Sequence, residues 1–129
     1  NWFRGSALSG RERQISVLTV VRFWDAKYPW AVQVRASLGA GVGQAEIDAI
    51  NERRDPGLTD PREKMAMEVT TQLLNAHRLT DETYAAAEEL FGEGDLVALI
   101  GVAGYFGMVA TTANAIDATP PDDAPARLV

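Results

Sequence analysis

Hydrophobic side chains recur at helical spacing along most of the chain. Between residues 10 and 27 they form one broad stripe: Ile15, Val17, Leu18, Val20, Val21 and Trp24. Several of them are β-branched, which also suits a strand, but the run is longer than a typical strand and has no internal break. The stripe therefore predicts a helix that is covered on two sides. Ser9 followed by Glu12 has the pattern of a capping box and predicts Ser9 as the N-cap.

Proline and glycine mark the boundaries of the next two helices. Pro29 disfavours α conformation at the residue before it and suits the first position of a helix. We therefore expect the first helix to end there and a second to span residues 29–38, because glycines that can end a helix follow. A third helix is predicted from Gly43, with Glu46 in its first turn, up to a polar loop at residues 51–58.

Three more helices are predicted in the second half of the chain. Asp60-Pro61 combines an N-cap residue with proline at the first helical position, which predicts a helix start. Thr80 opens a fifth helix, and the glycines of the segment FGEG end it. The sixth helix is the apolar run over residues 95–116. We find no strand pair and no repeat of 20–50 residues.

The apolar run over residues 95–116 is long enough to span a membrane. Glycine, threonine and asparagine dilute it, however, and no basic residue flanks it. We interpret it as a buried central helix whose small residues allow close packing. The predicted fold class is all-α: one compact domain of about six helices over residues 1–129, with a mobile Pro- and Asp-rich tail at 120–129. The abrupt opening NWFRGS leads us to expect that an N-terminal segment is missing.

Composition narrows the classes of partner. The chain has a net charge of −6, whereas nucleic acids and anionic membranes are bound through clustered Lys and Arg, so we expect neither as a partner. The chain contains no cysteine, which excludes thiol nucleophiles, disulfides and Cys-type zinc sites. One histidine cannot form a multi-His metal site. No stretch resembles a signal peptide, and we expect a cytoplasmic protein.

Three segments, in order, resemble the carboxymuconolactone decarboxylase family, whose members are relatives of alkylhydroperoxidase D. They are RERQISVLTVVRFWDAKY, YPWAVQVRASLGAGVGQAEIDAI and RLTDETYAAAEELFGEGDLVALIGVAGYFGMVATTANAI, followed by a closing TPP. Together they cover roughly residues 10–121. The resemblance implies an all-helical, cofactor-free domain that assembles as a homotrimer or homohexamer and acts on a small carboxylated or lactone substrate.

The chain departs from the family at the positions that carry chemistry. The non-thiol branch of the family resembles Glu-Trp-x-x-His followed by an Ala-Gly turn. Aligned on that turn, the family glutamate falls on Pro29 and the family histidine on Gln33, while Trp30 is retained. The two cysteines of the peroxidase branch would fall on Ala26 and Pro29, so thiol peroxidase chemistry is disfavoured.

Residues 29 and 33 lie one turn apart and share a helix face. A glutamate and a histidine there would form a proton-transfer pair able to protonate the carbanion that decarboxylation leaves behind. Proline offers no such group. Gln33 can donate and accept hydrogen bonds but cannot transfer protons, so its contribution would be to polarise a carbonyl or enolate oxygen.

Another proton donor would have to complete an active site. Tyr105, midway along the apolar run, lines the pocket in one interpretation and is a core tyrosine in the other. Tyr28, Pro29 and Trp30 would form the walls of a substrate pocket around Gln33. Four further polar residues have mainly structural interpretations, as an exposed helix end, a cap, an inter-subunit salt bridge and a backbone contact: His77, Asp25, Arg35 and Asn114.

Two functions remain open from the sequence. The first is a cofactor-free, lyase-like enzyme that uses Gln33 and Tyr105. The second is a non-catalytic relative that keeps the fold and the oligomer and either binds a small ligand or serves a structural role. A dry pocket closed by Trp30 and Tyr105 would favour the second function.

Overall fold

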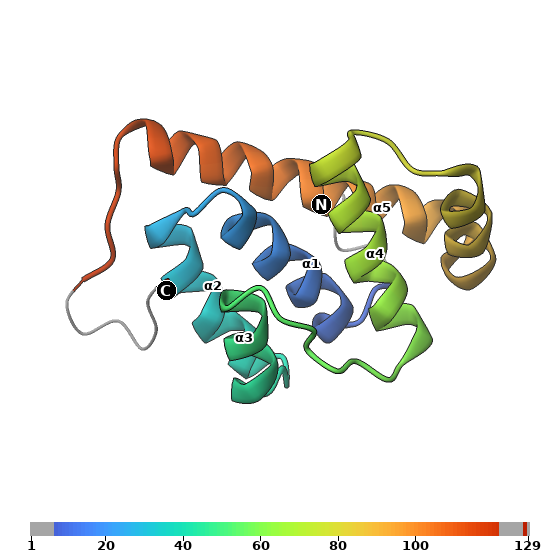
Figure 1. Cartoon of the computed structure of the whole chain (residues 1–129), viewed down its shortest axis with the longest axis horizontal. Helices are drawn as coiled ribbons and strands as arrows, with labels where there is room; N and C mark the ends of the chain where they lie inside the picture. The colour runs from blue at the N-terminus through green and yellow to red at the C-terminus, as the bar shows by residue number, and fades with distance from the viewer. Residues whose placement is uncertain (1–6, 122–127, 129) are drawn as a thin grey trace.

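Five helices follow one another in the computed structural model, which describes residues 7–121 and 128 (Figure 1). They are α1 (Gly10–Phe23), α2 (Lys27–Gly39), α3 (Gln44–Asn51), α4 (Pro61–Ala76) and α5 (Asp81–Ala115). The described residues contain no strand, so the predicted all-α single domain is confirmed. About six helices were predicted, and the structure has five because the predicted fifth and sixth form one element with a break. The predicted mobile tail lies mostly outside the described residues, since 122–127 and 129 are not among them.

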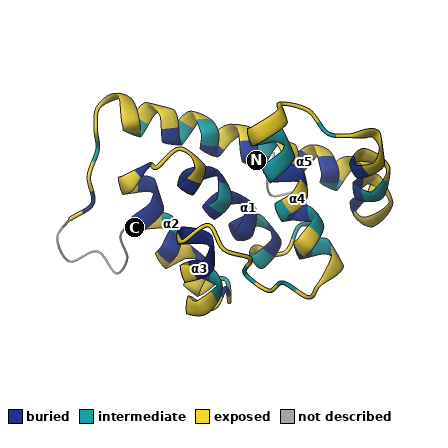
Figure 2. Ribbon diagram, in the orientation of Figure 1, coloured by how far each residue is buried: buried dark blue, intermediate teal, exposed yellow. Residues whose placement is uncertain are grey.

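Helix α1 is the element around which the other four pack. It contacts α2, α3, α4 and α5. Its residues from Gln14 to Leu18 are all buried, and in Figure 2 most of its length has the colour of buried residues. The broad apolar stripe that predicted a helix covered on two sides is therefore confirmed, because packing on opposite sides requires apolar side chains around most of the helix.

The break between α1 and α2 comes earlier than Pro29. Helix α1 ends at Phe23, and Asp25 adopts a left-handed conformation with φ 52°. Helix α2 begins at Lys27, so Pro29 is its third residue and not its first. Proline fits there because the first turn of a helix has no internal acceptors for its N–H groups. The predicted boundary at Pro29 is thus wrong by a few residues, although the proline does lie in the first turn.

The predicted fifth and sixth helices form one element with a break. Gly92 has φ 75° and ψ 164°, outside helical geometry, and it divides α5 into two helical segments. Glycine adopts this conformation without the steric cost of a Cβ atom. The interruption predicted at the segment FGEG is therefore present, but the chain continues as a helix immediately beyond it.

Helix α5 is buried on one face and exposed on the other. It is the one helix among the described residues that is long and apolar enough to cross a membrane by length and composition, yet only 39% of its most apolar window is buried. The expectation of a buried central helix is wrong, because α1 occupies the centre and α5 lies along its side (Figure 1). Large side chains on the outer face include Val97 and Met108, which is 58% exposed.

Local capping signals set four helix starts as predicted. Ser9 accepts from the Glu12 N–H at 2.9 Å while the Glu12 carboxylate accepts from the Ser9 N–H at 3.0 Å, which is a complete capping box. The N–H of Gly43 donates to Glu46 at 2.8 Å at the start of α3. Asp60 caps α4. Thr80 caps α5.

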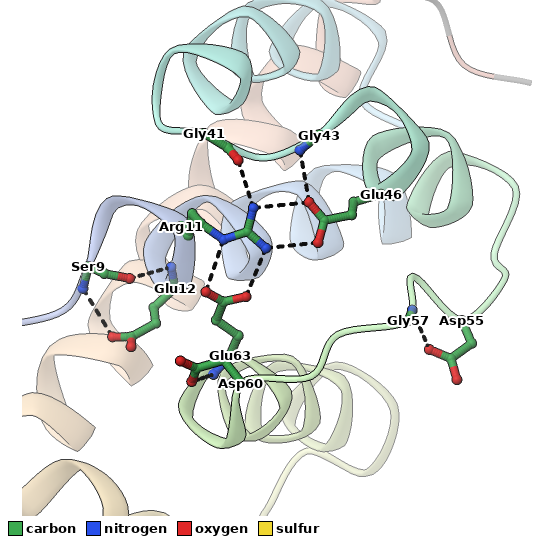
Figure 3. Close-up of polar contacts among 10 residues, drawn as sticks. All are labelled: Ser9, Arg11, Glu12, Gly41, Gly43, Glu46, Asp55, Gly57, Asp60 and Glu63. Carbon is green, nitrogen blue, oxygen red and sulfur yellow. Dashed lines mark hydrogen bonds and ion pairs between the residues drawn. The ribbon is translucent and has the colours of Figure 1, made fainter.

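The guanidinium of Arg11 joins α1 to α3 and α4 (Figure 3). Its Nε and Nη2 donate to the two carboxylate oxygens of Glu63 on α4, each at 2.9 Å. Its Nη1 and Nη2 donate to the two oxygens of Glu46 on α3, at 3.0 and 2.8 Å. Nη1 also donates at 2.7 Å to the carbonyl of Gly41, in the turn between α2 and α3. These bonds use all five N–H donors of the guanidinium.

Hydrogen bonds between Arg11 and the two carboxylates shift the pKa values of Arg11 and Glu46. Hydrogen bonds to Glu63 and then to Glu46 raise the pKa of Arg11. In return, the hydrogen bond from Arg11 lowers the pKa of Glu46. The three side chains are at most 30% exposed, so solvent screens them less than it screens an ordinary surface pair.

A second arginine, Arg62, joins the start of α4 to α1 and to the break in α5. Its Nε and Nη2 donate to Glu12 at 2.9 and 3.1 Å. Its Nη1 donates at 2.9 Å to the carbonyl of Leu90, and its guanidinium lies 4.6 Å from the ring centroid of Phe91. The break at Gly92 interrupts the helical hydrogen bonds that would otherwise use such carbonyls. Arg62 thus donates a hydrogen bond to a backbone carbonyl of α5 beside the break.

Replacing Arg11 by methionine tests the Arg11 contacts. The Arg11→Met variant removes five hydrogen bonds and leaves Glu46 and Glu63 close together without a cation. We expect the free energy of unfolding to fall by about 2 kcal/mol, between the values for exposed and for buried ion pairs. Urea unfolding of the native chain and of the Arg11→Met variant measures this difference in free energy.

The matched control is Arg35→Met. Arg35 is exposed on α2 and forms no ion pair with any residue from 7 to 121, so its replacement should change stability by less than about 0.5 kcal/mol. Equal effects of the two substitutions would contradict the role assigned to Arg11.

The stability that Arg11 contributes should depend on pH. The pKa of Glu46 is lower in the folded chain than in the unfolded chain, where it is about 4.3. The contribution is therefore complete above about pH 5 and is lost as the pH falls through the folded pKa. We expect the difference in unfolding free energy between the native chain and Arg11→Met to shrink at acid pH, as urea titrations at several pH values would measure. A difference that stays constant down to pH values near 3 would contradict the assignment.

Candidate functional site

The three aromatic and proline residues that open α2 take different environments. Tyr28 is 44% exposed, whereas Pro29 is buried and Trp30 is completely buried in the main hydrophobic core. The indole of Trp30 therefore packs as a core side chain. The three residues predicted to wall one pocket thus differ in exposure, from a half-exposed tyrosine to a completely buried tryptophan.

The indole N–H of Trp30 is buried without a hydrogen-bond partner among the described residues. A buried donor left in this state costs roughly 1–3 kcal/mol. The large apolar ring of Trp30 offsets that cost by its burial in the same core as Val17, Leu18 and Phe106.

Gln33 belongs to a polar cluster between α1 and α2. The Nε2 of Gln14 donates at 3.1 Å to the Oε1 of Gln33 and at 3.1 Å to the hydroxyl of Ser37. Gln14 is only 3% exposed and Ser37 is completely buried. Buried amides and hydroxyls need partners, and these three side chains supply one another's. The cluster thus gives Gln33 a structural function in holding α2 against α1.

The orientation of the Gln33 amide follows from Arg13. The Nη1 of Arg13 donates at 3.3 Å to the Oε1 of Gln14, and a guanidinium has donors alone. The oxygen of Gln14 must therefore face Arg13, and its NH₂ must face Gln33. Consequently the oxygen of Gln33 faces inward, and its NH₂ group makes no hydrogen bond to a described residue. The group that Gln33 presents outward is a donor.

Tyr105 lies on α5, where it is 46% exposed, and it is not a core tyrosine. Its ring packs edge-to-face on Phe106, with centroids 5.1 Å apart. The guanidinium of Arg13 lies 5.9 Å from the ring centroid of Phe106. No hydrogen bond joins Tyr105 to Gln33, the two residues expected to carry catalysis.

The chemistry available at Gln33 is hydrogen bonding. Among the described residues, neither Gln33 nor Gln14 forms a hydrogen bond to a carboxylate or an imidazole. Among the surface cavities lined by described residues are four of about 270 to 560 Å³, and no residue of the predicted site lines any of these four. The arrangement can therefore orient an acceptor but includes no group suited to proton transfer near neutral pH.

The other candidate donors lie elsewhere. His77 is exposed at the end of α4 with φ 68°, and Arg35 is exposed on α2. Asp25 accepts hydrogen bonds from Arg22 and from Arg53, the latter at 3.2 Å. Asn114 donates at 2.6 Å to the carbonyl of Trp24, which confirms the expected backbone contact.

Gln14 and Ser37 were not predicted from the sequence. Gln14 stands next to the apolar stripe of α1, and Ser37 lies four residues after Gln33 on the same face of α2. A lone glutamine beside an apolar stripe indicates a buried amide that needs a partner, and a second polar residue at i+4 offers one. Those two signals could have identified the cluster.

The described residues contain no group of three or more His, Cys, Asp or Glu side chains that could hold a metal ion. Comparison of the chain with protein-family models, with curated proteins and with solved structures finds no match.

Proposed function

We propose that the chain is a non-catalytic relative of the carboxymuconolactone decarboxylase family that serves as a structural oligomer. The observation that carries this proposal is the state of Gln33. Its amide oxygen is engaged by the buried Gln14, and no carboxylate or imidazole among the described residues bonds to either glutamine. A position that would hold the family histidine is here used to pack α2 on α1.

The energetic cost of lacking the proton-transfer pair also favours a non-catalytic role. Losing a general acid or base typically lowers a rate by about 10²–10⁴-fold. Pro29 has no ionisable group, and its side chain is buried in the first turn of α2. An efficient enzyme would need a replacement for both members of the pair at positions 29 and 33.

The second candidate function is a cofactor-free, lyase-like enzyme that acts on a small carboxylated or lactone substrate. The outward NH₂ group of Gln33 favours it, because an amide donor can stabilise the oxygen of a carbonyl or enolate. In this candidate Tyr105, half exposed on α5, would be the phenol that supplies a proton.

An assay with carboxymuconolactone-type acids separates the two functions. We expect the native chain to show no turnover above the uncatalysed rate, because it lacks the proton-transfer pair. The double variant Pro29→Glu/Gln33→His restores that pair and should gain measurable turnover if its helical content, followed by circular dichroism, is unchanged. Turnover by the native chain that Gln33→Leu abolishes would overturn the non-catalytic proposal.

The surface for self-assembly is the outer face of α5. Six residues follow one another there at spacings of four and three: Val97, Gly101, Gly104, Met108, Thr111 and Ala115. This is the spacing of a helix seam that packs against another helix. No charged residue lies between Asp95 and Asp117, so the face is uncharged and, apart from the hydroxyl of Thr111, apolar.

No neighbouring group within the chain requires a glycine at position 104 of this face. A Cβ atom added at Gly104 would meet nothing within 4 Å. Glycine inside a helix costs roughly 0.5–1 kcal/mol relative to alanine. On an exposed face, glycine lets the backbone of a neighbouring helix approach closely. We therefore assign the face to a second copy of this chain, within a homotrimer or homohexamer.

Sedimentation velocity tests this surface. We expect the native chain to sediment as an oligomer and the Met108→Glu variant to sediment as a monomer, because the substitution places a charge in the apolar contact. Tyr84→Glu is the matched control, since Tyr84 is a similarly exposed aromatic residue on the first segment of α5, away from the seam. Its oligomer should persist. A monomeric native chain, or an oligomer unaffected by Met108→Glu, would contradict the assignment.

A further inference from the structure

A cavity of about 410 Å³ opens between α1, the end of α3 and α4. Its volume lies within the range of roughly 300–1,000 Å³ typical of small-molecule sites. None of the residues of the predicted site lines it: Tyr28, Pro29, Trp30, Gln33 and Tyr105. A ligand bound in this cavity would therefore give the chain a property beyond the proposed function and independent of it.

One wall of this cavity is apolar. Ile50 from α3 and Met67 and Leu74 from α4 line it, and Ile50 is buried while the two α4 side chains are partly exposed. Thr71 lies one turn from each of the α4 residues, and its hydroxyl has no hydrogen-bond partner among the described residues. The wall can thus receive the apolar body of a ligand, with one hydroxyl free to bond to it.

The rim of the cavity is cationic. Arg53 and Arg54 follow the end of α3, where Arg53 has a left-handed φ of 57°, and both side chains line the cavity. No Asp or Glu is among the lining residues, in a chain whose net charge is −6. Both guanidinium groups are ion-paired, Arg53 with Asp25 and Arg54 with Glu52. Neither carboxylate lines the cavity, however, so the groups that line its rim are cationic.

The two rim arginines have donors to spare. Arg53 donates its Nη2 to Asp25 at 3.2 Å, and Arg54 donates its Nε to Glu52 at 3.1 Å. Neither guanidinium forms another hydrogen bond to a described residue, although each carries five N–H donors. Arg11, by contrast, uses all five in contacts within the chain. Arg11 therefore has no N–H donor left for a ligand, whereas Arg53 and Arg54 each have several.

We propose that this cavity binds a small organic carboxylate with an apolar body. The carboxylate accepts hydrogen bonds from the open donors of Arg53 and Arg54, a contact whose planar geometry suits a guanidinium. The body of the ligand lies along Ile50, Met67 and Leu74 and displaces water from them. Both parts are required, because the exposed arginines alone would hold an anion weakly in water.

Octanoate is a suitable probe, and two matched compounds distinguish the contribution of its apolar chain from that of its carboxylate. Octan-1-ol has the apolar body without the charge, and acetate has the charge without the body. Titrations of the ¹⁵N-labelled native chain, followed by amide chemical shifts, should place octanoate at Ile50, Thr71 and Leu74 with a dissociation constant of about 1 mM or lower. Octanol and acetate should each bind at least about tenfold more weakly.

Substitutions test the assigned residues. Arg53→Gln/Arg54→Gln should weaken octanoate binding by about tenfold or more and leave octanol binding unchanged. Met67→Glu, which places a negative charge on the apolar wall, should abolish octanoate binding. The control Arg35→Gln/Arg78→Gln removes two exposed arginines that do not line the cavity, and it should have no effect.

Three results would overturn the proposal. One is an absence of shifts at the cavity on titration with octanoate. Another is octanoate binding that survives Arg53→Gln/Arg54→Gln in a chain whose circular dichroism is native. The third is acetate or inorganic phosphate binding as tightly as octanoate, which would reduce the site to a non-selective cationic rim.

Discussion

The contacts of Arg11 are the interaction on which the arrangement of the first four helices depends. Its guanidinium takes both oxygens of Glu46 and of Glu63 and the carbonyl of Gly41. Helix α1 carries this arginine and also occupies the centre of the domain, so its first turn positions α3, α4 and the turn after α2. A planar fork with five donors can satisfy three acceptor groups at once, which a lysine could not do in the same geometry.

The degree to which polar groups are satisfied distinguishes structural from binding residues in this molecule. Arg11 has no donor left, and the amide of Gln14 donates to both Gln33 and Ser37. These contacts stabilise the fold and, apart from the NH₂ group of Gln33, leave little capacity to bind a ligand. Arg53 and Arg54, with most of their donors open beside an apolar wall, have that capacity. The most promising site of the chain is therefore not at the helix whose sequence resembles a catalytic motif.

Helix starts and breaks were largely predictable, because their signals are local. Ser9 with Glu12, Asp60 with Pro61, and Thr80 each place a side-chain acceptor within three residues of the N–H that it binds. Gly92 was predicted as a break because its conformation needs no partner elsewhere in the chain. The start of α2 was wrongly predicted at Pro29. Proline is equally acceptable at the first and third positions of a helix, and sequence alone does not separate them.

The sequence by itself determined an all-α domain, the capped helix starts and the absence of an ionisable pair at positions 29 and 33. The tertiary structure decided which polar groups meet. Arg11 lies 35 positions from Glu46 and 52 from Glu63, and no periodicity in the chain links them. The same holds for the exposed face of α5, since the composition of an apolar helix does not say which side its neighbours cover. Local signals act through hydrogen bonds within one turn, whereas burial and ion pairing depend on the packing of elements that are distant in sequence.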